Sequence, residues 1–269
     1  MRIVIDGDPG GGTPGANVDD VLALAYAAAS RHVEVTAIWT VAGNVTSAEG
    51  WRCTTEMTRL LGWDVPVRRG AENPRVRPTS GDARSAPPPA SPDTLASDLA
   101  GAEALICLGP ATNAARVLAA YPDAVDRVWA MAGSWREADT NARLDPAALG
   151  VLLGHPGLTL VPLTLTRQVV LPVVSWAQLP PGSIGAALAP WIDAWLAHPA
   201  CRKPPQGMWV HDVVALAGAE PGMLTTREAA LDLSPSATLT PGRHQVRLAT
   251  GANLEILNRL RAAITNRQQ

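Results

Sequence analysis

Short apolar runs rich in β-branched residues alternate with helix-like stretches through most of this chain. The expected strands cover residues 2–6, 33–41, 104–108, 128–131 and 158–163, and the expected helices lie near 18–30, 47–61, 113–120 and 145–153. Continuous apolar strands separated by helices favour a parallel sheet that is covered on both faces. The sequence therefore predicts an α/β fold, with a mostly parallel, Rossmann-like open sheet and helices on both faces, in a single domain spanning residues 1–269.

Polar side chains follow several of these expected strands at the point where each strand ends. They lie in residues 6–8, 40–44, 109–113 and 133–141. In open α/β sheets, ligands bind in the crevice beyond the carboxyl ends of the strands. We therefore expect these four segments to meet in one functional site.

The first of these segments belongs to a cluster of four carboxylates. Asp6 and Asp8 follow the first strand, and Asp19 and Asp20 open the next helix. Carboxylates that lie together repel one another unless a positive charge sits among them, and all-oxygen ligation suits Ca²⁺ or Mg²⁺. In a purely structural alternative, Asp6 and Asp8 end a strand and Asp19 caps the helix, which accounts for only part of the cluster. The pattern favours a metal-dependent enzyme.

Three further segments offer groups that suit such a site. The pair His211-Asp212 supplies a distant imidazole and carboxylate, although such a pair at a helix start is often only a cap. Thr112 offers a backbone carbonyl oxygen of the kind common in calcium sites, or else a helix N-cap. The loop over residues 132–141 carries several hydrogen-bonding side chains, which suit a polyhydroxylated ligand but also a solvated surface.

Composition narrows the range of partners. The formal net charge is −2, which gives no indication of nucleic acid or an acidic membrane surface as a partner. Three cysteines without metal-type spacing are typical of reduced thiols, and no apolar run approaches the ~18 residues of a membrane span. A cytoplasmic protein is expected. The Pro- and Ser-rich range 74–101 is expected to be a mobile surface loop, whereas 184–197 is expected to be a helix.

These segments together resemble the inosine–uridine-preferring nucleoside hydrolase family. That family opens with a strand followed by Asp-x-Asp-Pro-Gly-x-Asp-Asp, which is similar to residues 6–10 and 18–20 here. Four later blocks of the family match residues 40–46, 108–113, 141–148 and 211–212, in the family's order and over nearly the whole chain. The resemblance implies hydrolysis of a nucleoside to free base and sugar, and a homodimer or homotetramer.

The resemblance also implies a role for each site residue. Ca²⁺, in preference to Mg²⁺, is held by Asp8, Asp20, Asp212 and the Thr112 carbonyl, and it binds the ribose 2′- and 3′-hydroxyls and a water. Asp8 is the general base that activates this water, and His211 assists departure of the base. The sugar contacts implied are Asp19, Asn44, Ser134, Asp139 and Asn141. Asp6 supports the metal-binding residues without binding the ion itself.

Two departures from the family pattern leave alternatives open. Seven extra residues, 11–17, separate the two halves of the signature, and Ser134, Asp139 and Thr140 replace Asn, Glu and Phe of the family's sugar loop. These changes motivate a catalytically impaired relative that binds a nucleoside or metal, or acts as an assembly partner. A haloacid-dehalogenase-type phosphatase is a further alternative, because residues 4–8 resemble the Asp-x-Asp at the strand end of that family. It is the weaker one, because its chemistry needs a lysine beside the phosphate, and the only lysine, Lys203, lies in a Pro-rich loop.

Overall fold

Nine strands form one sheet in a computed structural model that describes residues 1–73, 75–79, 85–172, 179–201, 203–204 and 207–265. Their order is β10-β9-β11-β6-β5-β4-β1-β2-β3. The six neighbours from β3 to β6 and the strand β11 run parallel. At one edge of the sheet, β9 pairs antiparallel with β11, and β10 pairs antiparallel with β9. The bounds are β1 Arg2–Gly7, β2 Glu34–Thr40, β3 Val67–Arg69, β4 Ala104–Cys107, β5 Val128–Met131, β6 Leu158–Val161, β9 Leu224–Leu233, β10 Leu239–Pro241 and β11 His244–Ala252.

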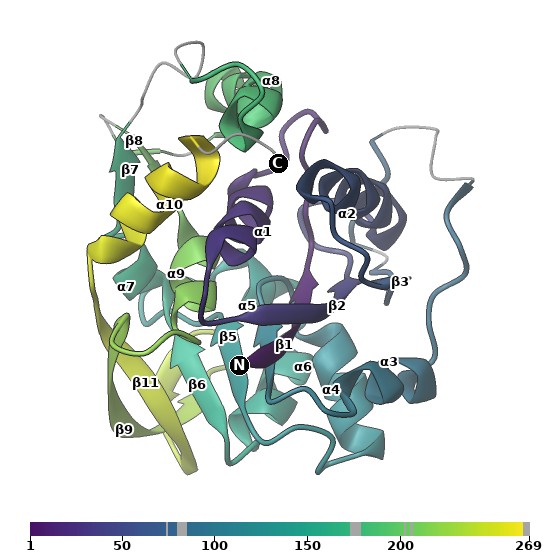
Figure 1. Cartoon of the computed structure of the whole chain (residues 1–269). Helices are drawn as coiled ribbons and strands as arrows, with labels where there is room; N and C mark the ends of the chain where they lie inside the picture. The colour runs from purple at the N-terminus through teal and green to yellow at the C-terminus, as the bar shows by residue number, and fades with distance from the viewer. Residues whose placement is uncertain (74, 80–84, 173–178, 202, 205–206, 266–269) are drawn as a thin grey trace.

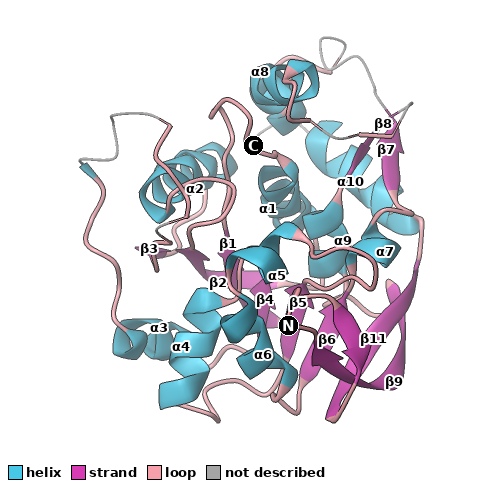
Figure 2. Ribbon diagram, turned by 180° about the vertical axis from the view of Figure 1, so that it is seen from behind, coloured by secondary structure: helices cyan, strands magenta, loops and turns pink. Residues whose placement is uncertain are grey.

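Helices cover both faces of this sheet (Figures 1 and 2). Successive strand residues point to opposite faces, so Ile3 and Ile5 enter one hydrophobic core and Val4 enters the other. The first core includes side chains of α1 Asp19–Ala29, α2 Ser47–Leu61, α8 Ile184–Ala197, α9 His211–Ala217 and α10 Glu255–Thr265; the second includes those of α3 Pro92–Leu99, α4 Thr112–Ala120 and α6 Pro146–Leu153. The predicted α/β class with a mostly parallel sheet is confirmed.

The strand order reverses its direction of growth at β1. From β1 the chain adds β2 and β3 on one side and β4, β5 and β6 on the other. A crevice forms at such a switch point, beyond the carboxyl ends of the two central strands. Asp6 lies at the end of β1, in register with Trp39 of β2 and Cys107 of β4. The predicted convergence of polar segments therefore falls at the switch point.

Several elements differ from the sequence expectation. The strand expected over 158–163 stops at Val161, because Pro162 follows and Leu163–Thr166 forms the short helix α7. The shorter elements α5 Thr140–Leu144, β7 Val170–Pro172 and β8 Gly207–Trp209, with the strands β9 to β11, were not expected. No helix in the described ranges is both long and apolar enough to traverse a bilayer.

Part of the range expected to be a mobile loop is a packed helix. Within 74–101, residues 74 and 80–84 lie outside the described residues, but Pro92–Leu99 forms α3 with Ser91 as its N-cap and a proline in the first turn. Leu95 and Leu99 are each 1% exposed and belong to the second core. The prediction of a mobile loop is therefore wrong for residues 92–99. Leu95 and Leu99, four residues apart, bury one face of a helix there.

Truncation of Leu95 tests whether α3 is part of the core. Leu95→Ala is expected to lower the free energy of unfolding by about 2–4 kcal/mol, because it removes a fully buried side chain and leaves a cavity. Ser97→Ala on the exposed side of the same helix is the control, with an expected change within about 0.5 kcal/mol. Urea denaturation curves measure both, and equal small losses would show that α3 does not contribute to the core.

Candidate active site

The helices α1, α4 and α9 begin near the carboxyl edge of the sheet without a capping side chain. The N-cap residues of α1, α4 and α9 are Val18, Ala111 and Val210, and none makes a side-chain capping hydrogen bond. The alternatives in which Asp19 or Thr112 serves as an N-cap are therefore wrong. Side chains do cap other helices, including Thr46 at α2 and Ser183 at α8. The acidic side chains at α1 and α9 follow the N-cap residues, where the positive ends of the helix dipoles favour them, and the Asp19 carboxylate accepts the backbone N–H of Asp212.

Asp19, Asp20 and Asp212 form the centre of the candidate site. One ligand atom of each lies within 4.8 Å of the others, and the three residues are 2%, 1% and 5% exposed. The helices α1 and α9 pack against each other in the first core, so their first turns bring together residues almost 200 positions apart. The trio differs from the predicted ligand set Asp8, Asp20 and Asp212, because Asp19 stands within it and Asp8 does not.

Asp8 lies directly beside this trio. Its backbone N–H donates to Oδ1 of Asp20 at 3.1 Å, and its Oδ2 accepts the backbone N–H of Asn44 at 2.5 Å. Nδ2 of Asn44 in turn donates to Oδ2 of Asp20 at 3.3 Å. A Cβ added at Gly43 would lie 1.8 Å from Oδ2 of Asp8, so only glycine fits where the β2 loop passes this carboxylate. Asn44 thus contacts two of the site carboxylates.

Burial and mutual repulsion dominate the electrostatics of the four carboxylates. Burial is the largest cause for each: it raises the pKa of Asp19 to about 7 and of Asp20 to about 6, and it raises the pKa of Asp8 and Asp212 well above their usual range. Neighbouring carboxylates raise the pKa of Asp8, Asp19 and Asp212 further. The main influences on these pKa values include no Lys, Arg or His among the described residues, so the charge is balanced by protons or by a bound cation.

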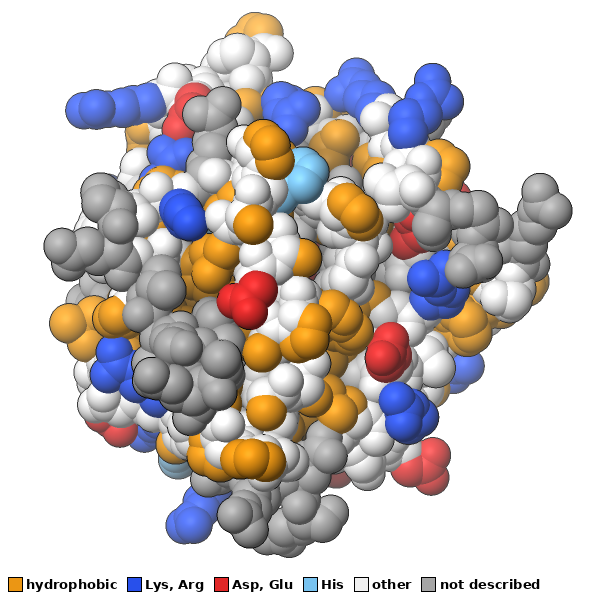
Figure 3. All heavy atoms as spheres, turned by 90° about the horizontal axis from the view of Figure 1, so that it is seen from above, with side chains coloured by type: hydrophobic (Ala, Val, Ile, Leu, Met, Phe, Trp, Pro, Cys, Tyr) orange, Lys and Arg blue, Asp and Glu red, His pale blue; other side chains and the backbone are white. Residues whose placement is uncertain are grey.

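The chemistry of the donors fits a hard divalent cation. All the side-chain ligand atoms are carboxylate oxygens, and they converge from two distant parts of the chain. Nearby, Oδ2 of Asp6 is buried without a hydrogen-bond partner among the described residues. Figure 3 shows one face of the molecule, on which the Asp and Glu side chains lie apart from one another. The carboxylates of the cluster are buried. A metal ion would therefore remove a repulsion that the fold leaves uncompensated.

Asn113, which follows Thr112 in the chain, holds the carboxylate of Asp6. Nδ2 of Asn113 donates to Oδ1 of Asp6 at 2.8 Å, and burial raises the pKa of Asp6 to about 7. Asp6 in turn is one of the charges that raise the pKa of Asp8. The hydroxyl of Thr112 donates to Oδ2 of Asp145 at 2.7 Å, and Asp145 caps α6. The sequence analysis did not assign Asn113 a role, although this residue lies in the polar segment 109–113.

The expected sugar-binding loop uses its polar groups to hold its own backbone. Asp139 is 4% exposed, accepts the N–H groups of Gly133 and Ala142 at 2.6 and 3.0 Å, and caps α5. Nδ2 of Asn141 donates to the carbonyls of Leu108 and Met131, at 2.6 and 2.8 Å, so it ties the ends of β4 and β5 together. Ser134 is 2% exposed, and its carbonyl accepts the N–H of Leu239. These contacts favour structural roles for Asp139 and Asn141.

His211 directly precedes Asp212 of the trio in the chain, and the pKa of its imidazole is lowered. Burial first, and the charge of Arg167 second, lower the pKa of His211 to about 4. The imidazole is therefore uncharged at neutral pH. Its Nδ1 lies 2.7 Å from the hydroxyl of Thr166, and its ring centroid lies 5.9 Å from that of Trp209. Thr166 was missed because it lies in α7, a helix that the sequence did not predict.

The similarity to known proteins extends over nearly the whole chain. The family model described as inosine-uridine preferring nucleoside hydrolase matches residues 3–263. The chain belongs to this family. A non-specific ribonucleoside hydrolase, RihC, of Klebsiella pneumoniae subsp. pneumoniae is 28% identical over an alignment 293 positions long including gaps, which covers 95% of this chain and 92% of that protein.

Solved nucleoside hydrolase structures share the fold. A plant nucleoside hydrolase superposes with a TM-score of 0.81 at 20% identity, covering 98% of each chain. A purine-preferring ribonucleoside hydrolase from Gardnerella vaginalis gives 0.78 at 21% identity, again covering 98% of each chain. Membership of the nucleoside hydrolase family supports hydrolysis of nucleosides to base and sugar, and the buried acidic trio is a place where a metal can bind.

Proposed function

We propose that this nucleoside hydrolase cleaves the N-glycosidic bond of a ribonucleoside, or of a related N-glycoside, in a Ca²⁺-dependent reaction. The observation that carries the proposal is the buried group of Asp19, Asp20 and Asp212, with Asp8 beside it and no basic side chain among the main influences on their pKa values. The name of the Klebsiella relative, a non-specific ribonucleoside hydrolase, supports the substrate class.

The ligands proposed for the cation are Asp8, Asp20, Asp212 and the Thr112 carbonyl, as the resemblance implies, with Asp19 added because it belongs to the trio. When bound, Ca²⁺ supplies positive charge that balances these carboxylates, and it polarises the groups that contact it. Ca²⁺ is preferred to Mg²⁺ because it tolerates irregular oxygen cages, whereas Mg²⁺ demands near-octahedral geometry.

The residues around the cluster suit the chemistry of glycosidic cleavage. Asp8 takes the proton of the attacking water, since its carboxylate is buried and is held by the Asn44 N–H. Positive charge develops on the sugar as the C1′–N bond breaks, and the neighbouring carboxylate of Asp19 stabilises it. Asn44 and Asp19 orient the sugar hydroxyls. The contacts of Asp139 and Asn141 favour a supporting role for this loop, with Ser134 beside it.

His211 assists the leaving base by hydrogen bonding, one of the two roles that the resemblance allows, the other being protonation. With a pKa lowered to about 4, its ring is neutral over the physiological range and becomes protonated only in acid. We propose that the neutral ring hydrogen-bonds the departing base, rather than protonating it as an imidazolium. Thr166 fixes the ring orientation through Nδ1 at 2.7 Å.

Asp8→Asn tests the general-base assignment. We expect kcat to fall by about 10²–10⁴-fold, the usual contribution of a positioned base, while the circular dichroism spectrum stays unchanged. Asp123→Asn, at an exposed turn position, is the matched control and should leave kcat unchanged. Release of reducing sugar from a panel of nucleosides, with chelator or with Ca²⁺, measures both variants. Unaltered turnover in Asp8→Asn would remove the assignment.

The alternative proposal is a catalytically impaired relative that binds a nucleoside or metal. It is motivated by the interrupted signature and by the sugar loop, whose polar groups are committed to the backbone. Calorimetric titration with Ca²⁺, followed by the reducing-sugar assay on the same sample, separates the two proposals. Metal binding without sugar release from any nucleoside favours the impaired protein.

A further inference from the structure

The seven extra residues of the signature close into a loop with a narrow neck. The N–H of Thr13 donates to the carbonyl of Gly10 at 2.9 Å, and the N–H of Ala16 donates to that of Thr13 at 3.1 Å. A Cβ added at Gly10 would lie 2.3 Å from the Cβ of Ala16, which is itself 4% exposed. The two ends of the inserted loop, residues 11–17, therefore meet. This closure explains how Asp8 still reaches Asp20 across twelve positions of sequence.

The outer part of the inserted loop rests on helix α8. A Cβ added at Gly11 would lie 2.4 Å from Cε3 of Trp191, and one at Gly12 would lie 3.0 Å from Nε1 of the same ring. Further along, a Cβ added at Gly15 would lie 2.8 Å from Cε1 of His198. Figures 1 and 2 both show the loop after β1 beside α8. The backbone of the loop thus packs directly against the Trp191 indole.

Helix α8 belongs to the chain segment that leads to Asp212. It lies between β7 and β8, and β8 is followed directly by α9, the helix that begins with His211 and Asp212. On one side, α8 packs against α10, where a Cβ added at Gly185 would lie 2.7 Å from the carbonyl of Ile264. On another, Trp191 meets the inserted loop. The contact therefore joins the two segments that supply the carboxylates of the site.

We propose that Trp191 is a positioning residue: its indole holds the inserted loop against α8 and thereby fixes Asp8 and Asp19 relative to Asp212. Seven additional residues, rich in glycine, would otherwise loosen the connection between Asp8 and Asp19, because a longer flexible loop has more conformations to lose. Docking on Trp191 limits these conformations. The inference rests on the proposed function for its effect on metal binding, but not for the contact itself.

Trp195 provides a matched control on the same helix. Both tryptophans are partly buried against the first core, one helical turn apart, but the atoms nearest to Gly11 and Gly12 belong to Trp191. The experiment compares Trp191→Ala, Trp195→Ala and the conservative Trp191→Phe in the full chain. Hydrogen exchange of the peptide that contains the amides of Thr13 and Ala16 measures the loop, and calorimetric titration with Ca²⁺ measures the site.

Trp191→Ala is expected to speed exchange in residues 11–17 and to weaken Ca²⁺ binding by about 10-fold, the effect typical of groups that support metal ligands. Trp191→Phe should restore both properties, and its kcat at saturating Ca²⁺ should stay within about twofold of that of the unmodified protein, because a ring still holds the loop and the reacting groups are intact. Trp195→Ala should leave exchange of the loop and Ca²⁺ affinity unchanged.

Three results would overturn the inference. The first is loop exchange that does not respond to Trp191→Ala, and the second is faster exchange with unchanged Ca²⁺ affinity. The third is equal effects of Trp191→Ala and Trp195→Ala, which would reduce the contact to general stability of α8. If the unmodified protein binds no Ca²⁺, the proposed metal site fails and the positioning role fails with it, whereas the exchange comparison still decides whether Trp191 holds the loop.

Discussion

Asparagine in place of Asp212 is expected to lower nucleoside hydrolysis by about 10³-fold and, at the same time, to raise the melting temperature of the metal-free protein. Asp212 is 5% exposed, and burial and the charges of Asp19 and Asp20 raise its pKa well above the usual range. The amide keeps the size of the side chain, is neutral without taking up a proton, and offers an N–H to a neighbouring carboxylate. A gain of ~1 kcal/mol would raise the melting temperature by about 2–4 °C.

Addition of Ca²⁺ should reverse this order of stability. The unmodified protein gains stability when the ion binds the folded state, whereas Asp212→Asn lacks an ionised ligand and gains little. Hydrolysis should fall by about 10³-fold, as for loss of groups that stabilise transition-state charge. Thermal melts in chelator and in Ca²⁺, with the exposed Asp123→Asn as control, measure the effect. A lower melting temperature of Asp212→Asn in chelator would show that the carboxylates do not repel one another.

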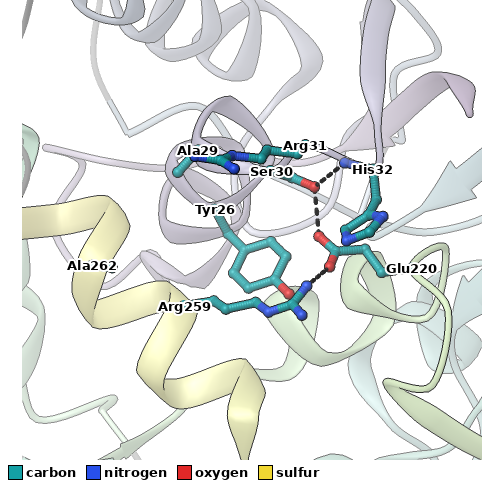
Figure 4. Close-up of a pocket in the computed structure, with 8 residues that line it drawn as sticks. All are labelled: Tyr26, Ala29, Ser30, Arg31, His32, Glu220, Arg259 and Ala262. Carbon is teal, nitrogen blue, oxygen red and sulfur yellow. Dashed lines mark hydrogen bonds and ion pairs between the residues drawn. The ribbon is translucent and has the colours of Figure 1, made fainter.

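Loss of Arg259 is expected to destabilise the fold far more than loss of its partner Glu220. In Figure 4, Glu220 lies between Arg259 of α10 and Ser30 at the end of α1. One carboxylate oxygen accepts the Ser30 hydroxyl at 2.6 Å and the other pairs with the guanidinium. The Glu220 side chain is 1% exposed, whereas that of Arg259 is 37% exposed. Arg259→Met therefore leaves a buried carboxylate without its cation and should cost about 3–5 kcal/mol.

The reciprocal variant, Glu220→Gln, leaves Arg259, the more exposed partner, without its carboxylate. In Glu220→Gln, water can solvate the guanidinium, and the expected cost is about 1 kcal/mol. The double variant Arg259→Met/Glu220→Gln should recover most of the loss of Arg259→Met, because no unpaired buried charge remains. Urea denaturation of the three variants measures these differences. Equal losses for the two single variants would contradict the assigned burial of the pair, which links α1 and α10 to the end of α9.

The central part of the fold was predictable because its strands are buried on both faces. The strands near residues 2–6 and 128–131 are continuous apolar runs, and α2 was expected at its observed bounds, Ser47–Leu61. At the edge of the sheet the signal is weaker. Strand β9, Leu224–Leu233, mixes exposed polar residues with few buried ones, so its sequence does not differ clearly from that of a loop.

The site was predictable as a group of residues but not in its detailed contacts. The resemblance implied that Asp8, Asp20 and Asp212 share one site, whereas the trio in the structure is Asp19, Asp20 and Asp212, because α1 and α9 present their first turns to each other. Which polar groups are already satisfied by the backbone depends on loop conformation. The capping role of Asp139 and the bridging role of Asn141 therefore required the structure, as did the lowered pKa of His211.

The most direct test is a crystal structure of the protein grown with Ca²⁺, with the ion located by its anomalous scattering. A single ion is predicted within ligand distance of Asp20 and Asp212, with Asp8 and Asp19 at the same centre. Anomalous density elsewhere in the molecule, or these carboxylates spread too far apart to share one ion, would contradict the account.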